Sequence, residues 1–525
     1  MMQGKKKFSE KMFTNFQLSE RVPADNFYGR LRQTLDLGWL YKATKEYYGT
    51  EGQQSIDPIV FFKLMLIGYL ENLGSDRRII STVSMRLDML FFLGYNIDES
   101  LPWHSTLSRT RQLYGEEIFK QLFRDVLKQC IDKGMVAGRR QVMDSVAVKA
   151  NASMDSLVEK EILEDATIYA DELRNEEEEK QKDDDQKNDN NTTVSAARNK
   201  AIQLHHQWKA KAYKDMPRGK SLTKGDKGRR PKFVSNHTHY STTDPDARVS
   251  VKPGKPRQLN YTAQVSVDTA HHVITQIQTD YADKKDSQCL PSLVSNTINN
   301  LKEEGLQIEE AFADAGYSSG EALKALEQNN ITGYIPNFGQ YKPSREGFRY
   351  DKENDRYTCS RGVHLPFKKL ITTSLGYKMK VYRSSSKDCG PCPLRSACIG
   401  KSDFKKIDDS IDKPFYDRMH ARLQTVNRET IRQLRSSTVE PVLGTLVNYL
   451  AMRRVNTRGI KQASKCMLMS AVAYNLKKLL KWQQRKVETT VRAMQKAEKR
   501  LAFYFFRLFH FRQSHNSTRL IFSLS

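Results

Sequence analysis

The chain has 525 residues and a formal net charge of +25, with 86 lysines and arginines against 61 acidic residues. A chain well above about 250 residues seldom forms one compact core, so this length predicts several structural units. The positive charge favours a polyanion such as nucleic acid as partner, although a basic protein kept soluble by its charge is an alternative.

Apolar segments are too short for a membrane protein. The longest cluster, Leu501 to Phe509, is interrupted by Arg507 and falls short of the ~20 residues that cross a bilayer. No apolar stretch follows the lysines near the N-terminus, so we expect no signal peptide. Seven cysteines are too few for a disulfide scaffold in so long a chain, which favours a reducing compartment. We therefore expect a cytoplasmic protein with no membrane contact.

Residues 1–135 are predicted to form a helical domain. Asp57 and Pro58 supply an N-cap and a first-turn proline for a helix that continues to Leu70. Further helical patterns run over Asp76–Phe92 and Ser105–Tyr114. Short helices with exposed arginines suit a DNA groove, and a bundle with merely solvated arginines is an equal alternative. The candidates for DNA contacts here are Arg77, Arg78, Arg109 and Arg111.

The next segment predicts a strand and then a charged insertion. Gln141–Val148 is rich in β-branched and apolar residues, yet it contains one acid, Asp144. Residues 155–240 hold an acidic tract followed by a basic one. Blocks of like charge bury little, so we expect this insertion to stay outside the core.

Strand signals return after the insertion. They cover Asn260–Asp268, Val273–Thr279 and Glu310–Asp314, with helices at 287–304 and from Ser319. Antiparallel strands followed by alternating strand and helix predict a mixed α/β sheet. Helix then dominates to about residue 500, with 439–450 and 461–482 as its clearest segments.

Three carboxylates are candidates for catalysis. Asp144 lies in a predicted strand, Asp314 ends another before Gly316, and Glu440 precedes Pro441, which fits the first turn of a helix. Carboxylates from separate elements can hold two Mg²⁺ or Mn²⁺ ions for phosphodiester chemistry. Spacing alone is weak support, because capping or ion-pairing acids would give the same pattern.

Four phrases add specificity. In chain order they are Met143-Asp-Ser-Val-Ala-Val-Lys-Ala-Asn151, Thr243-Asp-Pro-Asp-Ala-Arg248, Ala313-Asp-Ala-Gly-Tyr317 and Val439-Glu-Pro-Val-Leu-Gly444. This ordered set resembles the DDE transposases of bacterial insertion sequences. The region Asp57 to Tyr114, including Pro102-Trp-His-Ser-Thr-Leu-Ser108, likewise resembles their helical N-terminal domain.

The resemblance implies an α+β, mixed α/β chain with a ribonuclease H-like catalytic core. Asp144, Asp314 and Glu440 match the catalytic positions, which use Mg²⁺ or Mn²⁺ (two ions) to cleave the element's ends and to join the 3′-hydroxyl to target DNA. Double-stranded DNA, a homo-oligomer and a nucleoid-associated place in a bacterial cell are expected. The predicted units are 1–135 (helical, DNA-binding), 139–340 with 403–482 (catalytic), 155–240 (charged insertion), 341–402 (zinc-ribbon-like insertion) and 483–525 (basic, aromatic tail).

Two positions depart from the family pattern. Val447 stands where a basic residue often follows the glutamate by seven positions, and Arg453 and Arg454 are candidate substitutes. Arg435 is the nearest candidate for the arginine that usually precedes the glutamate. Further contacts to the DNA backbone are expected from Arg248 and Lys252.

A cysteine cluster predicts a second metal. Cys359 stands thirty residues before Cys389, and Cys392 and Cys398 follow. A lone Cys, a CxxC pair and another Cys suit a tetrahedral structural Zn²⁺ site, against the alternative of free cysteines. Cys130, Cys289 and Cys466 have apolar neighbours and are expected in the core.

Two other functions share these features. A relic transposase without catalysis could act as a DNA-binding repressor, and a metal-dependent nuclease could cut without joining. The altered positions around Glu440 keep the first open, and the shared fold keeps the second. The tail, residues 483–525, could be an interaction helix or a segment without function.

Overall fold

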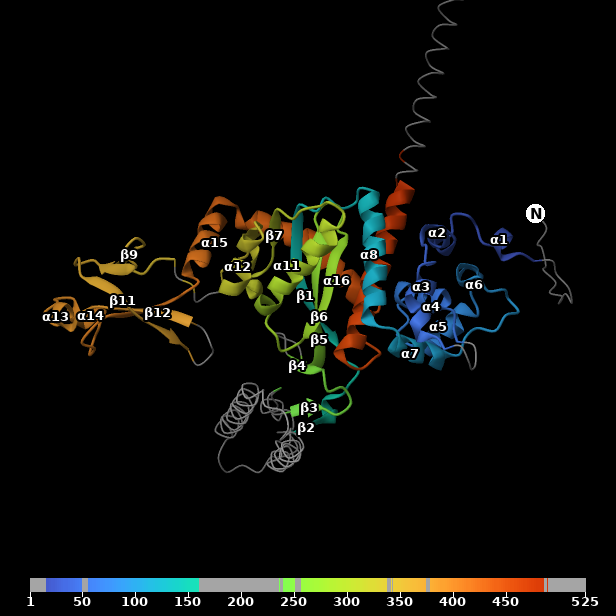
Figure 1. Ribbon diagram of the computed structural model, residues 1–525, viewed down its shortest axis with the longest axis horizontal. Helices are drawn as coiled ribbons and strands as arrows, with labels where there is room; N and C mark the ends of the chain where they lie inside the picture. The colour runs from blue at the N-terminus through green and yellow to red at the C-terminus, as the bar shows by residue number, and fades with distance from the viewer. Residues whose placement is uncertain are drawn as a thin grey trace, which may run out of the picture.

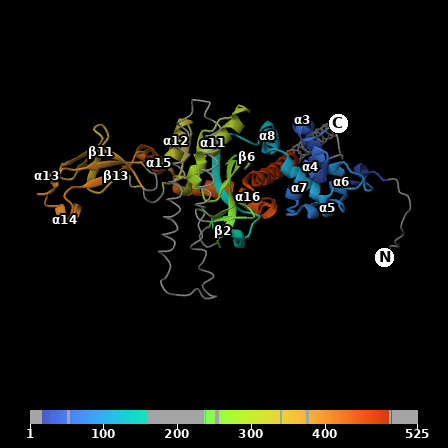
Figure 2. The same ribbon diagram turned by 60° about the horizontal axis from the view of Figure 1, so that its bottom comes forward.

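The computed structural model describes residues 16–49, 55–159, 236, 239–250, 256–337, 341, 343–373, 378–485 and 489. Both views show a mixed sheet with its helices in the middle, the N-terminal helices at one end and a second sheet at the other (Figures 1 and 2). The expected mixed α+β architecture is thus confirmed. None of the described helices is long and apolar enough to cross a membrane.

The N-terminal part is helical, as expected. Asp57 caps α4 by accepting hydrogen bonds from the amides of Ile59 and Val60 at 2.7 and 3.1 Å. The helices here are α1 (Leu18–Arg21), α2 (Phe27–Thr34), α3 (Leu40–Thr44), α4 (Pro58–Leu70), α5 (Asp76–Val83), α6 (Leu87–Leu93), α7 (His104–Leu113) and α8 (Glu116–Asp132).

The expected single helix over Asp76–Phe92 is in fact two helices, α5 and α6. The chain breaks at Arg86, which has an extended backbone and donates two hydrogen bonds to Asp88 at 2.8 and 2.7 Å. The apolar spacing continues across the break, so periodicity could not reveal it.

A six-stranded sheet forms the centre. Its path is β4-β5-β1-β7-β8, and β6 pairs with the same edge of β5 as β4 does. β5 is antiparallel to β1, whereas β7 and β8 continue parallel to it. The strands are β1 (Arg140–Lys149), β4 (Arg248–Ser250), β5 (Gln258–Asp268), β6 (Ile274–Tyr281), β7 (Glu310–Phe312) and β8 (Thr332–Tyr334).

Helices cover both faces of this sheet. α11 (Asp286–Lys302) packs on β5 and β6, and α16 (Arg428–Tyr449) packs on β1 and β5. α12 (Gly320–Gln328) and α15 (Lys413–Thr425) pack near β8. Neighbouring residues of a strand point to opposite faces. Asp144 contacts α16 and the partner of Ser145, Gln264, contacts α11, so these two helices lie on opposite faces.

The helical residues 460–485 join the N-terminal part to the sheet. Buried Lys465 donates hydrogen bonds to the carbonyls of Arg111 and Tyr114 at 2.9 and 2.6 Å. Ser464 donates to Glu116 at 2.9 Å. One continuous hydrophobic core includes residues of all these elements. The N-terminal helices therefore share one core with the central sheet.

The charged insertion leaves and returns at one point. β2 (Leu157–Glu159) pairs antiparallel with β3 (His239–Ser241), and the hydroxyls of Ser156 and Ser241 are 2.7 Å apart. Most of the predicted insertion over 155–240, and nearly all of the tail over 483–525, lie outside the described residues.

The cysteine-bearing insertion is a five-stranded antiparallel sheet in the order β13-β12-β11-β10-β9. It extends to Ser410 rather than residue 402, because β13 pairs with β12 along its whole length. Its small core is Tyr357, Leu365, Tyr382 and Ile407. The elements are β9 (Phe348–Asp351), β10 (Arg356–Cys359), β11 (His364–Thr372), β12 (Lys378–Arg383), α13 (Ser386–Cys389), α14 (Arg395–Cys398) and β13 (Lys406–Ser410).

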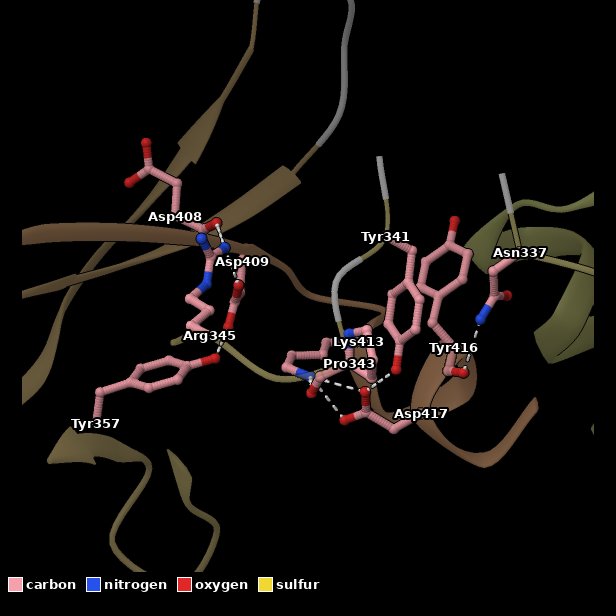
Figure 3. A network of polar contacts seen from close by, with 10 residues as sticks. All are labelled: Asn337, Tyr341, Pro343, Arg345, Tyr357, Asp408, Asp409, Lys413, Tyr416 and Asp417. Carbon is pink, nitrogen blue, oxygen red and sulfur yellow. Dashed lines mark hydrogen bonds and ion pairs between the residues drawn. The ribbon is translucent and has the colours of Figure 1, made fainter. Parts of the chain in front are cut away.

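A polar network ties this second sheet to α15 (Figure 3). Arg345 pairs with Asp409 at 2.6 Å, and the Tyr357 hydroxyl donates to the same carboxylate. On the other side of the junction, Asp417 accepts hydrogen bonds from Lys413, at 2.7 Å, and from Tyr341. Both chain segments that lead into the sheet take part, so the network fixes how the sheet leaves the core.

Candidate active site

The strand register brings Asp144 and Asp314 together. β1 and β7 are parallel and pair Val142 with Phe312. Two residues further along each strand, the next positions on the same face are Asp144 and Asp314. Neighbouring strands lie about 4.8 Å apart. Two acids 170 positions apart in the sequence therefore become neighbours because of one register.

Each carboxylate has one oxygen held by the backbone. The amide of Ser145 donates to Asp144 Oδ1 at 2.8 Å, and the amide of Gly316 donates to Asp314 Oδ1 at 2.8 Å. The second bond forms because Asp314 caps the short 3₁₀ turn η5 (Ala315–Tyr317). These bonds leave Oδ2 of both residues available to a common partner.

Arg435 of α16 is that partner. Its Nη2 atom lies 3.2 Å from Asp144 Oδ2 and 3.9 Å from Asp314 Oδ2. Its Nε atom is buried and has no hydrogen-bond partner among the described residues. One cationic group thus lies within 4 Å of both free carboxylate oxygens, so both oxygens face the same position.

Burial dominates the electrostatics of Asp144. Loss of water raises the pKa of Asp144, while the Ser145 amide and the Arg435 guanidinium oppose this rise. The negative charge of Asp314 adds to the rise. Asp314 is more open, with 41% of its side chain exposed against 17% for Asp144. The pair therefore joins one desolvated and one accessible carboxylate.

Sequence reasoning missed a second layer behind this pair. Asp286 accepts a hydrogen bond from Gln264 at 2.7 Å, and the same amide group accepts one from the buried Tyr317 hydroxyl. Burial, followed by the charges of Asp286, Asp144 and Asp314, raises the pKa of Tyr317. The sequence indicates only that Asp286 stands where a helix begins. Many acids that merely cap helices occupy the same position, so this signal could not identify its role.

Other atoms lie too close to Gly316 for a side chain to fit. Its φ is not positive, so the glycine is not explained by backbone conformation. A Cβ atom there would lie 2.9 Å from Asp314 Oδ1 and 3.5 Å from Asp286 Oδ2. We expect Gly316→Ala to push the Asp314 carboxylate away from Asp144. It should lower the DNA cleavage that the family resemblance implies about 100-fold, because an ~1 Å misplacement has that cost. Single-turnover cleavage rates measure the effect.

Gly74→Ala is the matched control for this prediction, because a Cβ at Gly74 meets nothing within 4 Å. Its cleavage rate should equal that of the unmodified chain. Equal rates in Gly316→Ala and Gly74→Ala, with both proteins folded by circular dichroism, would contradict the role given to Gly316.

Glu440 does not join the two aspartates in this structure. It is exposed on α16, five residues after Arg435 and therefore about 140° around the helix from it. Among the described residues, no group of three or more metal-ligating side chains could hold an ion. Pro441, expected in a first turn, lies in the interior of α16, which begins at Arg428. That expectation was wrong.

The N-terminal arginines divide into two kinds. Arg77, Arg78 and Arg109 are exposed. Arg111 is 2% exposed and binds both carboxylate oxygens of Asp76, at 2.6 and 3.2 Å. The proposed DNA contact of Arg111 is therefore corrected, since its guanidinium is committed inside the helical domain.

The remaining basic candidates lie along the sheet. Arg248 stacks on Tyr281 at 4.7 Å and pairs with Asp283 at 3.6 Å. Arg453 and Arg454 are exposed, and their segment pairs with the end of β1. Lys252 lies outside the described residues.

The four candidate zinc ligands are half-buried free cysteines. Cys359 ends β10, Cys389 ends α13 and Cys398 ends α14, and Cys392 lies in the turn between these two helices. In the part of the chain that the structure describes, they are not gathered around one point. Cys130, Cys289 and Cys466 are buried, as expected of core residues.

Comparison with known families adds to this geometry. Residues 16–113 match the family model described as a transposase domain, and residues 358–480 match the one described as a transposase DDE domain. The second match contains Arg435 and Glu440, whereas Asp144 and Asp314 lie outside both. No curated protein matches the chain.

Proposed function

We propose that the chain is an insertion-sequence DDE transposase, which cleaves the ends of a mobile element and joins them to target DNA. The matches of residues 16–113 to a transposase domain and of residues 358–480 to a transposase DDE domain support this proposal. The observation that carries this proposal is the convergence of Asp144 and Asp314 on Arg435. In metal-dependent phosphodiester cleavage and transfer, carboxylates hold the metal ions, and the Oδ2 oxygens of these two residues face one position.

We infer that the six-stranded sheet is the core of a ribonuclease H-like domain. The strand order is β6-β5-β1-β7-β8, and β5 is the one strand of this order that runs antiparallel to the others. The acids stand on β1 and shortly after β7. Helix α16, which carries Arg435 and Glu440, packs on the face to which Asp144 points.

Asp144 and Asp314 would hold the divalent ion. Their Oδ2 oxygens are hard ligands of the kind that Mg²⁺ and Mn²⁺ prefer, and both already face one cation. Bound there, Mg²⁺ or Mn²⁺, in the pair of ions expected for the family, supplies Lewis-acid chemistry at the phosphodiester. The Ser145 and Gly316 amides keep the carboxylates oriented. When a metal ion replaces Arg435 as the partner of the two carboxylates, the guanidinium would be close enough to bind a phosphate oxygen.

We propose Glu440 as the third carboxylate, reached by a local change in α16. Pro441 has no amide hydrogen to donate to the carbonyl of Ser437, which weakens the helix beside Glu440. A partial unwinding at this point would let the side chain turn toward β1. Because Glu440 is exposed and lies away from the two aspartates, a DNA-binding repressor without catalysis is the second candidate function.

One assay separates the candidate functions. The full-length protein is incubated with Mg²⁺ or Mn²⁺ and a duplex that carries the element's end together with a target plasmid. Joined products are expected of a transposase, cut ends alone would indicate a nuclease, and binding without cutting would indicate a repressor. Double-stranded DNA is the proposed partner in all three cases, and a homo-oligomer on paired ends is proposed for the first.

Zinc remains a proposal that rests on cysteine spacing. Metal analysis of purified protein is expected to find about one zinc per chain, since four thiolates make one tetrahedral site. Replacing Cys389 and Cys392 by serine should release it, whereas the matched replacement of the buried Cys130 and Cys289 should not. Zinc content that is unchanged by the first pair, or absent from the unmodified protein, would contradict this site.

A further inference from the structure

A shallow hollow of about 540 Å³ lies at the end of β1 that follows Asp144. Lys149, the last residue of β1, and residues Arg257 and Gln258 at the start of β5 form one side. Arg454 closes it from the segment that pairs with Lys149.

The charge of this hollow has one sign. Its lining contains the cations of Lys149, Arg257 and Arg454, and none of the described lining residues is acidic. The other lining groups include hydrogen-bonding side chains of Asn151, Ser153, Thr243 and Gln258. The larger hollow beside α8 and α11, of about 840 Å³, is lined by lysines and an arginine, but also by Glu116, Glu117 and Glu303. Only the smaller one therefore suits an anion.

The polar groups of the hollow are partly preorganised. Arg454 Nη2 donates to Asn151 Oδ1 at 2.8 Å, and Asn151 Nδ2 donates to the carbonyl of Asn456 at 3.2 Å. The Lys149 amide bonds to the carbonyl of Arg453, and the amide of Val455 bonds to the carbonyl of Lys149. Backbone hydrogen bonds of the β-sheet type thus fix the segments that carry Lys149 and Arg454 relative to each other.

We propose that this hollow binds a phosphodiester of the DNA backbone outside the reacting centre, an inference that rests on the proposed function. Lys149 is five residues beyond Asp144 on the same strand, or about 17 Å along it. Successive phosphates of one DNA strand rise ~3.4 Å along the helix axis. The distance from Asp144 to Lys149 spans several nucleotide steps, so a phosphate bound in the hollow is a different one from the phosphate that would react at Asp144.

The test compares two double variants that each remove two positive charges. Lys149→Ala/Arg454→Ala alters the hollow. Lys133→Ala/Lys302→Ala alters exposed lysines outside it, one directly after α8 and one in the last turn of α11. Affinity for a fluorescent duplex of arbitrary sequence is measured by anisotropy over a range of salt concentrations without divalent ions. Phosphate contacts do not depend on base sequence, so no element end is needed.

We expect the first variant to lower the salt slope of log affinity by about 1 to 2, because each phosphate contact contributes ~0.9. The control should keep the slope of the unmodified protein. Lys149→Gln/Arg454→Gln, which retains hydrogen bonding to Asn151, should behave as the alanine variant does, and melting curves verify that all variants fold.

Three outcomes are distinguishable. A reduced slope in the hollow variants alone supports the phosphate site. Equal slopes in the hollow and control variants overturn it while leaving the proposed transposase function intact. If the unmodified protein shows no salt-dependent DNA binding, both the site and the proposed function fail.

Discussion

Replacing Asp144 or Asp314 by asparagine is expected to reduce DNA cleavage at least about 1,000-fold while DNA binding persists. Each substitution removes the negative charge from an Oδ2 oxygen that faces the shared cation position. Losing one metal ligand costs several kcal/mol of transition-state stabilisation, and each ~1.4 kcal/mol is a factor of ten in rate. Cleavage rates in Mg²⁺, with affinities from anisotropy, measure both quantities.

Asp132→Asn is the matched control for these substitutions, since Asp132 is exposed at the end of α8, before β1 begins. It should cleave as the unmodified protein does. Variants at Asp144 or Asp314 that cleave at the control rate would remove both residues from the catalytic machinery.

Asp144→Asn is also expected to raise the melting temperature in the absence of divalent ions. Burial raises the pKa of Asp144, so the folded state disfavours its charged form. An acid with a raised folded pKa contributes stability below its unfolded pKa, and this contribution is lost as pH rises through the folded pKa. At neutral pH the ionised group therefore destabilises the fold, and asparagine removes that cost.

Melting curves in EDTA between acidic and neutral pH show this effect. The advantage of Asp144→Asn should be greatest at neutral pH and should shrink as the pH falls toward the range where the unmodified Asp144 becomes protonated. A variant that is less stable than the unmodified protein at every pH would mean that the pairing with Arg435 outweighs the burial of Asp144.

Arg111→Ala is expected to destabilise the N-terminal helices by about 3 to 5 kcal/mol, the cost of breaking a buried ion pair by removing one partner. Arg111 is 2% exposed, and its loss leaves Asp76 without its bidentate partner. It also removes side-chain atoms that pack against Met65. Urea denaturation followed by circular dichroism measures the loss.

Arg109→Ala provides the comparison, because Arg109 lies on the same helix, is exposed and bonds only to Ser105 among the described residues. Its cost should be within about 0.5 kcal/mol. A double variant that also replaces Asp76 by alanine should recover part of the stability lost in Arg111→Ala. Equal costs for Arg111→Ala and Arg109→Ala would return Arg111 to the surface candidates for DNA binding.

Local signals in the sequence predicted the elements that depend on local chemistry. Asp57 and Pro58 marked the start of α4, and the isolated acid in an apolar run marked β1 with Asp144 inside it. Asp314 was expected at the end of a strand and stands two residues after β7. Capping and alternation are properties of neighbouring residues, so one sequence was sufficient for them.

Partners from distant elements could not be predicted. The role of Arg111 depends on Asp76, which is 35 positions away, and the second layer joins Gln264, Asp286 and Tyr317 from a strand, a helix and a turn. Exposed and buried arginines look alike in a helical pattern. Only the packing of α5 against α7 shows which arginine is committed to an ion pair.

The orientation of α16 was also beyond the sequence. Its apolar residues fit the expected helix, but the helical phase that faces β1 is set by packing against the sheet. That helical phase turns Arg435 toward the aspartates and Glu440 toward solvent. Proline is common in the first turn of a helix, which favoured a helix beginning near Pro441. The helix instead begins at Arg428 and contains Pro441 in its interior.

The claim that Asp144 and Asp314 share one cation is tested most directly by the effect of Mn²⁺ on thermal stability, measured with the full chain and without DNA. A ligand bound only to the folded state adds about 2.7 kcal/mol at 100 times its dissociation constant. We predict that Mn²⁺ raises the melting temperature of the unmodified protein and of Asp132→Asn, and leaves Asp144→Asn and Asp314→Asn nearly unchanged. An equal rise in all four proteins would contradict the account.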